Sequence, residues 1–137
     1  MRKIGTALIL AAFGGGCYCA IETVWRGKSH WTMFIVGGVC FLLLCAVDGA
    51  FREKLPRPGR WLLGAAAVTA VEFVSGCLLN LCARWHVWDY SGRRLNLLGQ
   101  ICPRSAVYWL LLAIPAMLLG EHLLKAVNHL FRRRQPR

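Results

Sequence analysis

Four long runs of apolar residues alternate with short polar segments along the chain. The runs cover residues 4–25, 31–51, 61–83 and 106–127, and each contains only one or two charged side chains. The hydrocarbon core of a bilayer is about 30 Å thick, and a helix needs about 20 mostly apolar residues to cross it. The pattern therefore predicts an all-α fold, an integral membrane bundle of four transmembrane helices.

The length of 137 residues leaves room for one structural unit and for no separate catalytic domain. We expect a single transmembrane domain over residues 1–137, with a basic tail at residues 128–137. The first run follows Arg2 and Lys3, as the apolar part of a secretory signal peptide also would. It continues to residue 25 without a favourable cleavage site, so we expect it to remain as the first helix.

The connection between the third and fourth runs, residues 84–105, is the longest and is not a plain linker. Trp85, Trp88 and Tyr90, near its start, are aromatic residues suited to the headgroup layer. A half-apolar stretch follows at residues 95–102. This stretch is too short to span a bilayer, and it predicts an interfacial or re-entrant segment between helices three and four.

The formal net charge of +11 is distributed unevenly over the predicted loops. With four crossings, the N-terminus, the second loop and the C-terminus share one face, which carries eleven of the cations, while the other face carries six. The positive-inside rule therefore places both termini in the cytoplasm. Arginines 132–134 lie just beyond the predicted last helix, so the tail is expected to contact anionic lipid headgroups rather than nucleic acid.

Glu72 lies near the middle of the third run. A carboxylate at that depth costs at least about 2.5 kcal/mol on insertion scales, so it must be protonated, paired or in contact with water. Thr69, Gly76 and Asn80 lie at three- and four-residue steps along the same helix face. This face is a candidate site for a proton or a cationic solute. The alternative is that Glu72 hydrogen bonds across the bundle and serves packing alone.

Three other acidic residues lie in the predicted helices. Glu22 has Arg26 one turn later, so it either forms an ion pair on the helix surface or joins Glu72 around one cation. Asp48 and Glu121 lie nearer the cytoplasmic ends, each with a basic residue four positions on. For both, we expect an ion pair at the membrane boundary.

Motifs for enzymatic chemistry are absent from the sequence. It has no His-Glu-x-x-His pattern, no glycine-rich phosphate loop and no nucleophile elbow. The seven cysteines include no pair with the two-residue spacing of a zinc or redox site. We therefore expect no metal and no cofactor, and a non-enzymatic function is favoured. An intramembrane enzyme that modifies a lipid, using Glu72 with His86 or Asp89, is the remaining enzymatic alternative.

Several blocks from the third run onward form a recognisable combination. They are residues 72–80 (EFVSGCLLN), 88–91 (WDYS) and 95–102 (LNLLGQIC), followed by Trp109. The combination resembles the bacterial CmpB-like family, ABC-transporter type IV, which is related to the vertebrate transmembrane protein 229 group. Glu22 fits an acidic position of that family, although Ile21 stands where an aromatic residue is expected. The resemblance covers about residues 14–109 and implies a small helical membrane protein with a transport function.

The loop blocks also suggest individual roles. Trp88 and Tyr90 would anchor the segment at the headgroups, and Asn96 with Gly99 would let the chain bend back towards the bundle. Asp89 would either cap the start of the segment or pair with one of the loop arginines. The block 88–91 is then either a locked loop or a lid over a site next to Glu72.

These observations predict a small transport protein or permease-like transporter subunit in the inner (plasma) membrane of a bacterium. We expect a homo-oligomer or a complex with a partner membrane subunit. A non-transporting membrane scaffold is the first alternative, and the lipid-modifying enzyme is the second. The candidate residues for binding a substrate or ion are Glu72, Glu22, Asn80, Thr69, Trp88, Asp89, Tyr90 and Asn96.

Overall fold

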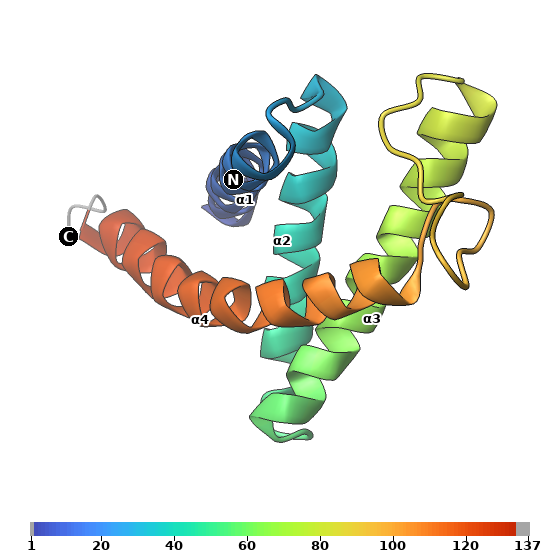
Figure 1. Ribbon diagram of the computed structural model, residues 1–137. Helices are drawn as coiled ribbons and strands as arrows, with labels where there is room; N and C mark the ends of the chain where they lie inside the picture. Colours follow the sequence, from blue (N-terminus) through green and yellow to red (C-terminus); the bar gives the residue numbers. More distant parts are fainter. Residues whose placement is uncertain (1, 134–137) are drawn as a thin grey trace. The chain divides into compact units, whose positions relative to one another are not determined.

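Four α-helices and one short π-helix account for most of the computed structural model, which describes residues 2–133 (Figure 1). The helices are α1 (Arg2–Arg26), α2 (Trp31–Phe51), α3 (Arg57–Gly76) and α4 (Pro103–Arg133), and the π-helix η1 (Cys77–Cys82) continues α3. The shortest span, α2, has 21 residues. At 1.5 Å per residue it is about 31 Å long, which matches the bilayer core. All four spans are long and apolar enough to cross a membrane, so the predicted fold is confirmed.

Prolines lie at the starts of α3 and α4, and both helices begin before the apolar runs do. α3 starts at Arg57 with Pro58 in its first turn, and Pro103 is the first residue of α4. Proline is compatible with a first turn because the first N–H groups of a helix have no intrahelical acceptor. Both helices therefore extend beyond their apolar runs into the charged flanking residues.

The end of α4 also lies beyond the predicted fourth run. The helix continues through Arg133, so residues 128–133 of the predicted tail are helical, while residues 134–137 lie outside the described residues. Pro115 lies inside α4. A proline there removes one backbone hydrogen bond and favours a local bend.

The chain divides into two compact units. The first contains Met1–Ala46 and Pro115–Arg137, and the second contains Val47–Ile114. α1 and most of α2 therefore belong to the first unit, and α3 with the following loop belongs to the second. A single transmembrane domain over the whole chain stays a prediction.

Small residues bring the helices of the first unit into close contact. A Cβ atom on Gly38 of α2 would lie 2.7 Å from the backbone oxygen of Ala11 in α1. A Cβ atom on Gly120 of α4 would lie 2.6 Å from the Sγ atom of Cys45. Because the bilayer contributes little hydrophobic drive for helix association, such close van der Waals contacts are what holds membrane helices together.

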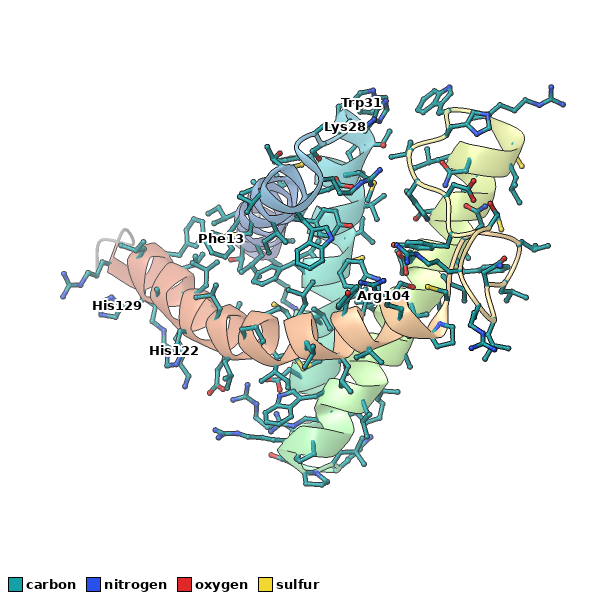
Figure 2. All side chains as sticks on the ribbon, viewed as in Figure 1. Phe13, Lys28, Trp31, Arg104, His122 and His129 are labelled. Carbon is teal, nitrogen blue, oxygen red and sulfur yellow. The ribbon has the colours of Figure 1, made fainter. Side chains whose placement is uncertain are left out.

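A short polar turn joins α1 to α2. Gly27 has a φ of 73°, a conformation that glycine adopts without steric cost. Its N–H donates to the backbone oxygen of Thr23 at 2.8 Å, which closes the end of α1. Lys28 and Trp31 lie at this end of α2 (Figure 2), a composition typical of a membrane boundary.

In the second unit, the segment between η1 and α4 folds back beside α3 (Figure 1). It contains turns and one isolated backbone pairing of Leu97 with Ile101, and no helix. Four of its non-glycine residues have a positive φ: Arg84, His86, Leu95 and Leu98. The segment predicted to be interfacial or re-entrant is therefore an irregular, hydrogen-bonded loop, and its depth in a bilayer stays a prediction.

Candidate functional site

The Glu72 carboxylate is buried in the second unit among neutral side chains, and only 6% of the residue is exposed. Its Oε2 atom accepts a hydrogen bond from the indole N–H of Trp109 at 2.8 Å, and its Oε1 atom accepts one from the hydroxyl of Tyr90 at 3.2 Å. The Ser105 hydroxyl also interacts with this carboxyl group. Helix α3, the loop and the first turns of α4 therefore meet at Glu72.

Among residues 2–133, Glu72 differs from the other acidic residues of the helices in having no basic partner. The other three each pair with an arginine or a lysine: Glu22 with Arg26, Asp48 with Arg52 and Arg60, and Glu121 with Lys125. The ion pairs predicted for Asp48 and Glu121 are therefore present. In the part of the chain that the structure describes, Glu72 forms no ion pair. A buried carboxylate without a counter-charge is unfavourable unless a proton or a cation neutralises it.

Tyr90 reaches Glu72 because the loop is fixed on both sides of the tyrosine. The backbone N–H of Tyr90 donates to the oxygen of Gly99 at 2.7 Å, and Asp89 Oδ1 accepts from the N–H of Ser91 at 2.8 Å. Gly99 has a φ of 69°, and a Cβ atom there would lie 3.1 Å from Asp89 Oδ1, so both conformation and space favour glycine.

Asp89 caps this turn and forms no ion pair with a loop arginine in the described residues. Hydrogen bonds from the side chain and backbone of Ser91, with a smaller contribution from His86, hold the pKa of Asp89 below its usual value. Of the two roles considered for Asp89, the structure shows the cap of the turn.

A second polar group joins the end of α3 to the loop. Asn80 in η1 is 5% exposed, and its Nδ2 donates to the side-chain oxygen of Gln100 at 2.9 Å. Its Oδ1 atom accepts from the N–H of Val87 at 2.7 Å, and the Trp88 indole donates to the backbone oxygen of Gln100 at 3.1 Å. Gly76 makes room for this group, since a Cβ atom there would lie 2.5 Å from the side-chain oxygen of Gln100. Asn80 and Trp88 therefore hold the loop against α3.

Thr69 and Asn96 bond within their own segments. The Thr69 hydroxyl donates to the backbone oxygen of Ala65 at 2.8 Å, in the preceding turn of α3. The Asn96 amide donates to two backbone oxygens of the loop, and its Oδ1 atom accepts from the N–H of Gly99 at 2.9 Å. Neither residue hydrogen bonds to Glu72, although Thr69 lies one turn away on the same helix face.

Glu22 belongs to the first unit, where both of its oxygens are engaged. Oε1 accepts from Arg26 at 2.6 Å and Oε2 accepts from the Ser29 hydroxyl at 2.7 Å. The ion pair considered for Glu22 is therefore present. A joint cation site of Glu22 with Glu72 stays a prediction.

Three residues that contact these groups were not among the sequence-based candidates: Trp109, Ser105 and Gln100. Helical spacing cannot connect Trp109 to Glu72, because 37 residues separate them. The available signal was the family-like block pattern, which contains both Trp109 and Gln100. The contacts themselves depend on how the loop folds.

The arrangement around Glu72 is suited to holding positive charge. The carboxylate supplies a full negative charge, and Tyr90 and Trp109 meet it with their O–H and N–H donors. Within residues 2–133 no three His, Cys, Asp or Glu side chains gather as a metal site would require. Neutralising the single carboxylate would take one positive charge.

Comparison with known proteins finds one matching family model and one similar protein among those compared. A family model described as "Putative ABC-transporter type IV" matches residues 8–135, nearly the whole chain. Protoheme IX farnesyltransferase 1 of Paramagnetospirillum magneticum is 30% identical over 142 residues, which cover 88% of this chain and 44% of that protein. The chain thus spans less than half the length of this relative. No solved structure matches the chain.

Proposed function

The chain belongs to the ABC-transporter type IV family, and from that premise we propose that it is a transport protein or transporter subunit whose Glu72 carboxylate binds a proton or a cationic solute. The observation that supports this site is the difference between Glu72 and the other acids of the helices. Those acids have basic partners, whereas Glu72 is buried with neutral donors only. Uptake of one positive charge would neutralise it.

The test is transport by purified protein in proteoliposomes, followed as tetraphenylphosphonium uptake and, separately, as proton flux with an entrapped pH dye. Glu72→Gln keeps the shape and an oxygen that accepts hydrogen bonds, but it removes the charge. Glu121→Gln is the matched control, because Glu121 lies on a membrane helix and pairs with Lys125. We expect Glu72→Gln to reduce both fluxes to the level of protein-free liposomes, which tetraphenylphosphonium enters slowly on its own, and Glu121→Gln to keep the wild-type flux.

Two outcomes contradict the proposal. Flux that persists in Glu72→Gln would remove Glu72 from the transport step. A wild-type protein that carries neither probe, and whose assembly is lost in Glu72→Gln, would favour the non-transporting scaffold. Both oxygens of Glu72 already accept internal hydrogen bonds, which is the observation that favours this second function.

We further propose that the protein lies in the bacterial plasma membrane with both termini in the cytoplasm. The support is the charge distribution, since the face with the termini carries eleven cations and the other face carries six. Four helices enclose little space, so we propose a pathway formed with a second copy or a partner membrane subunit. A C-terminal reporter that is active only in the cytoplasm tests the orientation, and crosslinking in native membranes tests the assembly.

The likeness to protoheme IX farnesyltransferase 1 favours one enzymatic alternative, an intramembrane protein that acts on a prenyl lipid. The chain spans only 44% of that relative, so this activity would require a further subunit or a second copy. Incubating the reconstituted protein with a radiolabelled farnesyl donor and haem tests it directly. Formation of a farnesylated product that depends on Glu72 would replace the transport proposal.

A further inference from the structure

Three leucines of the loop between η1 and α4 point away from the protein. Leu95 is 85% exposed, Leu97 52% and Leu98 62%. Leu95 and Leu98 have φ values of 56° and 52°, in the left-handed region that is sterically disfavoured for residues with a Cβ atom. Such a conformation persists only where the surrounding structure fixes it. The fold of the loop therefore holds Leu95 and Leu98 in these exposed positions.

Asn96 lies among the leucines and fixes their backbone. Its Nδ2 donates to the backbone oxygen of Arg93 at 2.8 Å, and its Oδ1 accepts from the N–H of Gly99 at 2.9 Å. The N–H of Leu97 donates to the backbone oxygen of Ile101 at 2.9 Å. The N–H and the oxygen of Leu97 and the oxygen of Leu98 thus have hydrogen-bond partners within the loop. Such a turn can present its apolar side chains to a non-aqueous medium without exposing those groups.

Two unpaired arginines immediately precede the leucines. Arg93 and Arg94 are exposed, and their side chains have no partner within the described residues. Asp89 accepts hydrogen bonds from Ser91 and does not neutralise them. Their guanidinium groups are therefore free to bind an external anion, and the paired N–H donors of a guanidinium match the oxygens of a phosphate.

The position of the loop along the chain determines which anion it meets. The loop connects the span Arg57–Cys82 to the span Pro103–Arg133, both long enough to cross a membrane. A connection between two spans lies at a bilayer boundary, where phosphate groups and acyl chains are adjacent. Trp85 is 50% exposed in the same loop, and Arg104 stands at the first turn of α4 (Figure 2), which is the composition of a headgroup layer.

We propose that residues 93–98, the Arg–Leu loop, form a binding surface for anionic phospholipid of the bilayer that holds the protein. Arg93 and Arg94 bind the headgroup phosphate, while Leu95, Leu97 and Leu98 enter the adjacent acyl region. This surface is independent of the proposed role of Glu72. Anionic lipid would fix the loop, and with it Tyr90, at one depth in the membrane.

The test places an indole at the tip of the loop. Leu97→Trp is chosen because Leu97 has an ordinary φ, and Leu95→Trp gives a second position if the first variant fails to fold. Each variant is reconstituted into phosphatidylcholine or phosphatidylglycerol vesicles whose acyl chains are brominated. Quenching is measured relative to wild type, which carries the same six native tryptophans. Leu111→Trp in α4, at a site 59% exposed within a membrane span, is the matched control.

We expect the indole introduced by Leu97→Trp to be quenched by brominated lipid, and about twice as strongly by phosphatidylglycerol as by phosphatidylcholine. Adding Arg93→Gln and Arg94→Gln should remove this preference, and the Leu111→Trp control should show none. Quenching by aqueous acrylamide with no effect of brominated lipid would overturn the proposal, since the loop would then face water or a protein. Equal quenching by the two lipids would overturn the proposed selectivity for anionic phospholipid, because both headgroups carry a phosphate and only phosphatidylglycerol has a net negative charge.

Discussion

The two aromatic donors to Glu72 give a graded prediction for cation binding. Both donors stabilise the Glu72 carboxylate most strongly while it is anionic and has no cation bound. Removing one donor should therefore favour the cation-bound state. A hydrogen bond to a charged group contributes about 1.5–3 kcal/mol, and a bond between neutral groups about 0.5–1.5 kcal/mol. Neutralising Glu72 therefore weakens each bond by about 1 kcal/mol. The hydrogen bond from Trp109, at 2.8 Å, should lose more free energy on neutralisation than the hydrogen bond from Tyr90, at 3.2 Å, because it is shorter.

We expect Trp109→Phe to tighten the binding of tetraphenylphosphonium about fivefold, because about 1.4 kcal/mol corresponds to a factor of ten. Phenylalanine keeps an aromatic ring and loses the N–H donor. Tyr90→Phe should have a smaller effect in the same direction. Trp61→Phe, on the same helix as Glu72 but with no hydrogen bond to it, is the control and should leave the affinity unchanged. Isothermal titration of purified protein in detergent at fixed pH measures all four affinities.

Two results would refute this reasoning. Identical affinities in the variants and the wild type would mean that the donors do not sense a change of charge at Glu72. Weaker binding in Trp109→Phe than in Trp61→Phe would mean that the indole N–H contacts the solute or positions the carboxylate for it. In either case the two hydrogen bonds to Glu72 would not oppose the uptake of positive charge by its carboxyl group.

Three further substitutions test the packing, the ion pairs and the loop. Gly38→Val should destabilise the fold by about 1–3 kcal/mol through overpacking, whereas Gly16→Val, which meets no atom within 4 Å, should have little effect in thermal unfolding. Asp48→Asn leaves a buried guanidinium without its counter-charge and should cost about 3–5 kcal/mol in the same assay. Since Ser91 lowers the pKa of Asp89, the carboxylate stabilises the loop at neutral pH, and this contribution is lost as the pH falls through that lowered pKa. The protection factors of the loop amides in hydrogen exchange, corrected for the intrinsic rate at each pH, should therefore fall in acid, and Asp89→Asn should remove this loss of protection.

Hydrophobic patterning predicted the membrane helices because apolar length is what a bilayer selects. The run at residues 31–51 coincides with α2, since charged or polar turns flank it on both sides. α3 and α4 start before the runs at residues 61–83 and 106–127, because Pro58 and Pro103 do not prevent a helix from beginning there. Both prolines lie in first turns, where a missing N–H removes no helical hydrogen bond.

The sequence allowed single residues of the candidate site to be predicted, but not the contacts between them. Glu72 stands out because a carboxylate in an apolar run is energetically exceptional. Its contacts with Tyr90 and Trp109 depend on a loop whose turns require left-handed backbone at Leu95 and Leu98, a conformation that no leucine indicates from sequence. For Asp89 the sequence left a cap and an ion pair with a loop arginine open, and the contact with the Ser91 N–H, which depends on the fold of the loop, is the cap.

The central claim is that the Glu72 carboxylate takes up positive charge, and infrared difference spectroscopy tests it most directly. Wild type and Glu72→Gln are reconstituted in lipid, and spectra are recorded before and after addition of tetraphenylphosphonium and across a pH titration. We expect a carboxyl band that is absent from Glu72→Gln and that shifts when the cation or a proton binds. A Glu72 band that stays unchanged under every condition would contradict the account and make this carboxyl group a packing element of the fold.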